Sequence, residues 1–175
     1  MAAEPTEPAA AEPSGANDEY SVSRVWKLVD KIRICMLATH DGERIRARPM
    51  SAIAREAENA LYFLTDVKGG KDDQIDRDGE VTLIFAKPDS GKFMSVIGQA
   101  RVLDDRALIN DLWSTAAEAW WEGPEDPSIR AIEVTPSQAE FWEGPHGLVA
   151  TVQMVIAAAT SMPPVLGDQR KVDLH

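Results

Sequence analysis

The chain has 175 residues, of which 44% are hydrophobic, and its formal net charge is -11. This length and composition suit one globular domain with a hydrophobic core, and the negative charge excludes nucleic acid and anionic membranes as main partners. No apolar run approaches the roughly 20 residues of a membrane helix, and the N-terminus lacks the features of a signal peptide. The single cysteine cannot form an internal disulfide. Together these features predict a cytoplasmic location.

The first 19 residues consist mainly of Ala, Pro and Glu, with five acidic residues and no Lys or Arg. Such a segment cannot bury enough apolar surface to offset its chain entropy, so we expect a disordered acidic tail over residues 1–19. From Tyr20 onward, apolar residues follow one another at helical spacing up to Ile32, which predicts a helix.

A β-hairpin is predicted next, because residues 35–39 and 44–54 are strand-like and flank the turn pair Asp41-Gly42. In its second strand Arg44, Arg46 and Arg48 alternate with small apolar residues, so three guanidinium groups share one face. Guanidinium groups match phosphate oxygens, which favours a bound anion such as a phosphorylated cofactor. The alternative is a solvated strand face whose arginines pair with acidic side chains.

A third strand is predicted over residues 60–65, followed by the turn Gly69-Gly70-Lys71 and a short helix over 72–77. Glycines let backbone N–H groups approach an anion, and a helix N-terminus adds favourable partial charge. The spacing is not that of a Walker loop. Lys71 therefore has two interpretations, as an anion ligand or as an ordinary surface residue.

The rest of the chain predicts further strands over 81–86 and 92–103, a helix from a cap at Asp104 or Asp105 to Ala119, two strands over 129–134 and 139–142, and a helix over 151–159. Residues 81–86 are apolar on both faces, so we expect this strand to be buried on both sides. Consecutive strands with short connections predict a mainly β fold with flanking helices, in which an antiparallel sheet closes into a small barrel. The predicted barrel domain covers residues 20–147, and residues 148–175 form a C-terminal helix and tail.

Six short motifs occur in an order and spacing that resemble a known family. They are Leu37-Ala38-Thr39, Arg48-Pro49-Met50, residues 61–65 (LYFLT), Gly70-Lys71 with Gln74-Ile75, residues 96–100 (VIGQA) and Glu140-Phe141-Trp142. Over residues 22–147 the chain resembles the pyridoxamine 5'-phosphate oxidase-like, FMN-binding split barrels, and in particular their general-stress-protein-like branch. The resemblance implies an antiparallel split β-barrel with FMN as cofactor, and a homodimer with the flavin at the subunit interface.

The resemblance also implies roles for individual residues. The flavin phosphate would meet Arg48, with Arg46 as a neighbouring candidate. The remaining residues implied at the cofactor are the backbone along the isoalloxazine edge at Pro49, Met50 and Ser51, the ribityl phosphate site at Leu64, Thr65, Gly70 and Lys71, and the aromatic residues Trp142 and Trp121. Trp121, or its neighbour Trp120, would reach the cofactor of the partner subunit. The alternative for these tryptophans is a role in the core or interface.

The chain departs from the vitamin oxidase where that enzyme carries a basic segment for substrate phosphate. Here the segment is residues 143–147 (EGPHG), without an arginine, so we do not expect pyridoxal phosphate synthesis. The expected function is an FMN-dependent oxidoreductase acting on an unidentified small molecule. The alternatives are a non-catalytic flavin-binding protein of the stress response, and a split barrel that binds deazaflavin or haem.

No side chain stands out as a catalytic or metal-binding group. Cys35 lies in an apolar run with no activating charge beside it, so we interpret it as a buried structural thiol. The three histidines are scattered without metal-ligand spacing, so no metal site is expected.

Overall fold

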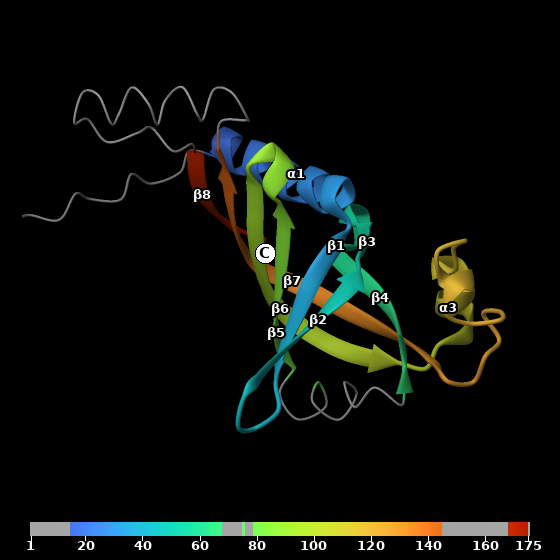
Figure 1. Cartoon of the computed structure of the whole chain (residues 1–175). Helices are drawn as coiled ribbons and strands as arrows, with labels where there is room; N and C mark the ends of the chain where they lie inside the picture. Colours follow the sequence, from blue (N-terminus) through green and yellow to red (C-terminus); the bar gives the residue numbers. More distant parts are fainter. Residues whose placement is uncertain (1–14, 68–74, 76–78, 145–167, 175) are drawn as a thin grey trace, which may run out of the picture.

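The computed structural model describes residues 15–67, 75, 79–144 and 168–174 (Figure 1). The helical elements are α1 (Gly15–Ile32), η1 (Glu56–Glu58), η3 (Pro88–Ser90), α3 (Arg106–Leu112) and η4 (Ala117–Ala119). The strands are β1 (Ile34–His40), β2 (Ile45–Ser51), β3 (Ile53–Arg55), β4 (Ala60–Asp66), β5 (Glu80–Lys87), β6 (Lys92–Leu103), β7 (Ile129–Glu143) and β8 (Asp168–Asp173).

The strands form one antiparallel sheet whose order is β2-β1-β5-β6-β7-β4-β3, with β8 also paired to β7. The two ends of this order, β2 and β3, are separated in the chain only by Ala52. The sheet must therefore curl until its two edges approach each other, and β2 does contact β4. The buried Ala52 fixes this crossing, because its N–H donates to the carbonyl of Arg33 at 2.7 Å. The predicted antiparallel split barrel is confirmed.

The main core fills the inside of the barrel and extends to α1, which lies across one end of it (Figure 1). The spacing of Val25, Trp26 and Val29 places all three on the face of α1 that is buried in this core. The helix begins at Gly15, five residues before the predicted start, so the segment 1–19 is not an unstructured tail throughout. Among the described residues, no helix is both long and apolar enough to cross a membrane.

A second, smaller core lies on the outer face of β4 and β7, where α3 packs. The predicted cap is present, since the Asp105 carboxylate accepts the N–H of Leu108 at 3.1 Å. The helix ends at Leu112 rather than at Ala119, because Trp113 adopts an extended backbone conformation and the chain then turns into η4.

Three predictions about the strands need correction. The two strands expected around Pro136 are one strand, β7. The register with β6 shifts by one residue between Ile97 and Gly98, and this bulge at Ser137 lets Pro136 stay within the strand. In β5 only the face of Val81, Leu83 and Phe85 is buried, whereas Ile84 on the other face is 45% exposed.

The third correction concerns the C-terminal segment. Strand β8 pairs with β7, and Val172 belongs to the main core, so the barrel domain does not end at residue 147. The helix predicted over 151–159 lies outside the described residues.

Candidate functional site

Arg48 lies on the inner face of the edge strand β2. It stands opposite the buried Leu37, and its neighbour on the same face, Met50, packs against the main core. The side chain is half-buried, and its Nη1 donates to Oγ1 of Thr39 at 3.1 Å. Thr39 is itself only 2% exposed, so its hydroxyl group holds the guanidinium group of Arg48 in place.

Thr65 lies near the end of β4, on the inner face of the barrel. It is 2% exposed and shares the inner face of β4 with Leu61 and Phe63 of the main core. Strands β1 and β4 both run away from α1, so Thr39 and Thr65 lie at the end of the barrel opposite that helix (Figure 1). Two hydroxyl groups and a guanidinium group, from three strands, therefore lie toward this end of the barrel, which we call its mouth.

The predicted ligands Gly70 and Lys71 lie outside the described residues. The connection between β4 and β5 does return to the barrel, because Ile75, four residues after Lys71, is buried in the main core.

Arg46 lies next to Arg48 on the same face of β2, but it points to the turn of the hairpin. Its Nε donates to Oδ2 of Asp41 at 2.7 Å, and its side chain is 55% exposed. The other oxygen of Asp41 accepts the backbone N–H groups of Arg44 and Glu43 at 2.8 and 3.0 Å. The hydrogen bond from Arg46, followed by those two, holds the pKa of Asp41 far below its usual range. The alternative stated for these arginines, pairing with an acid, is thus realised at Arg46.

The residues after Arg48 present different groups to each side of β2. Met50 points into the core, whereas Pro49 and Ser51 are exposed on the outer face, opposite Met36 and Ile34 of β1. β2 is the last strand of the sheet order, so part of its backbone faces away from β1. A planar ligand that forms hydrogen bonds to the backbone of β2 requires such an edge.

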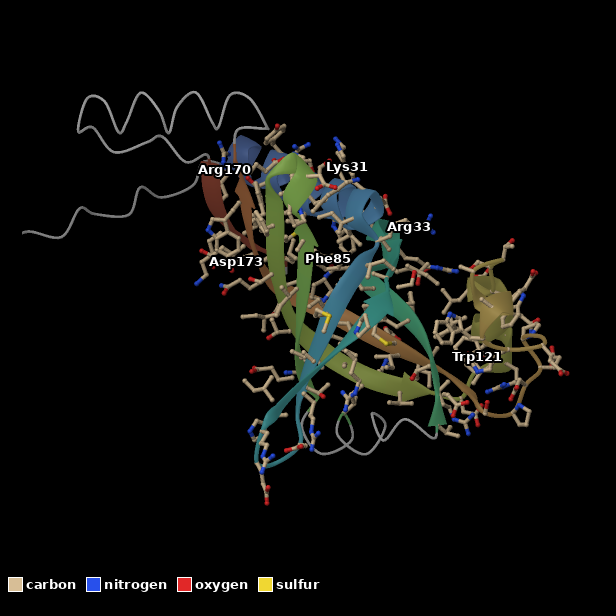
Figure 2. The ribbon with its side chains drawn as sticks, in the orientation of Figure 1. Lys31, Arg33, Phe85, Trp121, Arg170 and Asp173 are labelled. Atoms are coloured by element: carbon tan, nitrogen blue, oxygen red, sulfur yellow. The ribbon has the colours of Figure 1, made fainter. Side chains whose placement is uncertain are left out.

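Within one chain, the structure does not bring the remaining predicted residues to Arg48. Leu64 and Trp121 pack in the second core on the outer face of β4, and Figure 2 shows Trp121 beside α3. Trp142 lies twelve residues beyond Arg130, the partner of Thr65 on β7, which is about 40 Å along the strand. Trp120 is 80% exposed.

Two residues of this region were not predicted as site residues, namely Thr39 and Asp41. The Asp41-Gly42 turn is a signal for both residues. Asp41 belongs to the turn itself, and a hairpin closed there places Thr39 directly opposite Arg46. The contact of Arg46 with Asp41 depends on the side-chain direction, which only the folded hairpin decides.

The opposite end of the barrel holds a partly buried ion-pair cluster. Glu143 accepts from Nε and Nη2 of Arg24 at 2.7 and 2.5 Å and from Nζ of the buried Lys92. The hydrogen bond from Arg24, together with that from Lys92, lowers the pKa of Glu143 to about 2. Glu143 thereby joins α1 to β6 and β7.

Cys35 and the possible metal ligands lie in other parts of the molecule. Cys35 is buried in the main core, and desolvation raises its pKa to about 12, which confirms a structural thiol. In the part of the chain that the structure describes, no group of three or more His, Cys, Asp or Glu side chains could hold a metal ion.

Comparison with known proteins agrees with this architecture. Among curated proteins, the chain is 26% identical over 153 residues to protein bli-3 of Neurospora crassa, covering 80% of this chain and 73% of that protein. Among solved structures, a protein of the general stress protein 26 type from Jannaschia sp. CCS1 matches with a TM-score of 0.68 and 24% identity, covering 88% of this chain and 98% of that one. The general stress FMN/FAD binding protein of Xanthomonas citri matches with a TM-score of 0.66 and 25% identity, covering 74% and 93%.

The family model described as "Pyridoxamine 5'-phosphate oxidase like" matches residues 20–164, which is most of the chain. The split barrel, the order of its motifs and this match lead to one conclusion. The chain belongs to the pyridoxamine 5'-phosphate oxidase-like family, and the solved general stress proteins share its fold.

Proposed function

We propose that this protein binds FMN, with the flavin phosphate at Arg48 and the mouth of the barrel. The observation that carries the proposal is the hydrogen bond between Arg48 and Thr39 on the inner face, with the buried Thr65 toward the same end of the barrel. A guanidinium group and hydroxyl groups are suitable donors for phosphate oxygens. The general stress protein of Xanthomonas citri is an FMN/FAD binding protein with the same fold, which supports the proposal.

The protein is proposed to work as a homodimer, because the outer face of β1, β5 and β6 is apolar and exposed. Met36 pairs with Ile84 across β1 and β5, and Thr82 beside it pairs with Ile97 of β6. The exposed apolar residues of this face are Ile34, Met36, Ile84, Phe93 and Ile97. A contiguous patch of this kind on a small protein is typical of a subunit interface.

A second copy on this face would also explain why the predicted residues are scattered. Trp142 is half-buried on the outer face, opposite Phe93, and therefore belongs to the same surface. In a dimer, Trp142 and Trp121 can approach the flavin of the partner subunit, whereas neither lies near Arg48 of its own chain.

The proposed activity is oxidoreduction of a small molecule by the bound flavin. The flavin supplies hydride or electron transfer, and the protein binds and orients it. The described residues contain neither a reactive thiol nor a metal-binding group, which fits chemistry carried by a cofactor. Pyridoxal phosphate synthesis is not proposed, because residues 143–147 (EGPHG) contain no arginine to bind a substrate phosphate.

The experiment that tests the cofactor is an absorption spectrum of the purified protein, with the released cofactor identified by mass, before and after addition of FMN. A flavin band that persists through desalting supports the proposal. A haem band, or retention of deazaflavin in place of FMN, would replace FMN by that ligand. A colourless protein that does not retain FMN would overturn it. Reduction of the bound flavin by a nicotinamide nucleotide, with turnover in air, separates an oxidoreductase from a non-catalytic flavin carrier.

A further inference from the structure

Strand β2 contains no buried residue, in contrast to β1, β4, β5, β6 and β7. It stands at one end of the sheet order, so among the described strands its ladder of backbone hydrogen bonds joins it to β1 alone. A strand with few buried side chains and one exposed edge opens at a lower free-energy cost than the strands inside a sheet. The order of β2 is therefore sensitive to whatever binds to it.

The outer face of β2 continues the apolar face of β1, β5 and β6. Ala47 stands opposite Ala38 and Pro49 stands opposite Met36 in the register with β1. Met36 in turn stands opposite Ile84 of β5. In the middle of this surface, which we call the uncharged face, no outer side chain carries a charge. These side chains are Ala47, Pro49 and Ser51 of β2, Ile34, Met36 and Ala38 of β1, Thr82, Ile84 and Ala86 of β5, and Phe93, Ser95 and Ile97 of β6.

A face without charge fits a second copy of this chain. The formal net charge is -11 and 27% of the residues are charged, so two copies repel each other where their charged surfaces meet. They can approach on a face that carries no charge, and burial of its apolar side chains then stabilises the pair. A partner recognised by its charge would find no complementary group on the uncharged face.

Two binding surfaces thus lie on opposite sides of β2. Ala47 and Pro49 are exposed and belong to the uncharged face. Arg48, between them, lies on the inner face, where its Nη1 donates to Thr39 and where the flavin phosphate is proposed. A second copy on the outer side and a flavin on the inner side each make the opening of β2 more costly. Whichever binds second meets a strand that is already ordered, and so loses less conformational entropy.

We propose that dimerisation and flavin binding are linked through β2, so that each raises the affinity of the other. Because such linkage is reciprocal, a dimer that binds FMN more tightly than the monomer must itself be strengthened by FMN. Coupling between two sites is typically about 5- to 150-fold in affinity. This inference rests on the proposed function, which provides the flavin phosphate at Arg48 and the second copy on the outer face.

The test uses the full-length protein freed of cofactor, above and below the concentration at which analytical ultracentrifugation shows the dimer to dissociate. Flavin fluorescence quenching should give an FMN dissociation constant roughly 10-fold lower for the dimer than for the monomer. Ile84→Glu is expected to be monomeric and to bind FMN as weakly as the wild-type monomer, although Ile84 lies on β5, outside the proposed flavin site. Tyr20→Glu makes the same change of charge on α1 and is the matched control, which should bind FMN as the wild-type dimer does.

Hydrogen exchange followed by mass spectrometry tests whether β2 carries the linkage. Without FMN, the backbone amides of residues 45–51 should exchange more slowly in the wild-type dimer than in Ile84→Glu, by roughly 10-fold. The amides of β7, inside the sheet, serve as the reference and should stay protected in both proteins. A flavin that merely touched both subunits would link binding to dimerisation without this protection in the absence of FMN.

Several outcomes would overturn the inference. Equal FMN affinity of monomer and dimer would do so, as would linkage without protection of residues 45–51. An Ile84→Glu variant that stays dimeric would also overturn it, because the second copy would then lie on another surface. These outcomes leave FMN binding intact. A wild-type protein that retains no FMN, or that is monomeric at every concentration, would contradict the proposed function itself, which keeps the two failures distinguishable.

Discussion

Gly98 of β6 and Thr135 of β7 approach so closely that a Cβ at position 98 would lie 2.6 Å from the carbonyl oxygen of Thr135. It would also meet Val134 Cγ1 at 2.9 Å and the Cα of Pro136 at 3.0 Å. The contact lies at the bulge that keeps β7 continuous, so only glycine permits this pairing.

The first prediction follows from this contact. Gly98→Ala is expected to lower the free energy of unfolding by about 1–3 kcal/mol, because backbone atoms must shift to admit the methyl group. Urea unfolding measures this change. Gly123→Ala is the control, since a Cβ there meets nothing within 4 Å, and it should change stability by less than about 0.5 kcal/mol. Equal stability of the two variants would show that β6 and β7 do not pair as described.

The second prediction concerns the flavin phosphate. Arg48→Ala should weaken FMN binding by about 1.5–3 kcal/mol while the protein stays folded, because it removes a charged donor. The same loss is expected for Lys71→Ala, whose position the sequence alone suggests. Fluorescence titration measures both affinities, and Arg101→Ala serves as the charge-matched control. Wild-type affinity in both variants would show that the phosphate binds elsewhere.

The third prediction concerns pH. The pKa of Glu143 is about 2 in the folded protein against an ordinary value of 4.5, so its ion pairs stabilise the fold fully above pH 4.5 and are lost as the pH falls toward 2. Glu143→Gln is expected to lower the free energy of unfolding at pH 7 by about 3 kcal/mol, because Lys92 stays buried without its partner.

The difference between Glu143→Gln and the wild type should shrink as the pH is lowered below 4.5, since the protonated Glu143 then resembles glutamine. Urea unfolding at several pH values measures it. Glu118→Gln, on an exposed turn, is the control and should show no such dependence. A difference that is constant between pH 7 and pH 3 would contradict the ion pairs described for Glu143.

The fourth prediction concerns the proposed dimer. Ile84→Glu places a charge in the middle of the exposed apolar face and should convert the dimer to a monomer, as light scattering after size exclusion would show. Tyr20→Glu is the control, because Tyr20 is also exposed and apolar but lies on α1. If Ile84→Glu remains dimeric, the subunits associate through another surface.

The fifth prediction concerns Cys35. Its burial and its pKa of about 12 keep the thiolate form rare at pH 8, so a thiol-reactive disulfide reagent should not modify the native protein. One thiol per chain should react after unfolding in denaturant. Rapid reaction of the native protein would mean that the inner face of β1 opens to solvent.

The local patterns predicted correctly were those in which neighbouring residues decide the conformation. The Asp41-Gly42 pair closes the hairpin, and alternation places Arg46 and Arg48 on one face of β2. Local patterns gave a wrong prediction where pairing with a distant strand decides the conformation. Pro136 interrupts a strand unless Gly98 lies opposite the bulge, so two strands were predicted where β7 is one.

The candidate site could be predicted only in part, for the same reason. The motifs led to Arg48 and Thr65, and the structure places both at one end of the barrel. Pairing of Arg46 with Asp41 depends on side-chain direction, and no sequence pattern encodes it. Trp142 has the right residue type, but β7 places it far from Arg48, so its predicted flavin contact depends on the proposed dimer.

The sequence by itself determined the antiparallel class of the fold, the hairpin with its row of arginines, and the family, because periodicity, turn residues and motif order are local properties of the chain. The tertiary structure alone decided that β8 joins the barrel and that Ile84 remains exposed. It alone decided that Glu143 binds Arg24 and Lys92. The physical reason is that strand pairing, burial and buried ion pairs depend on residues distant in the chain, and they become defined only when the sheet closes.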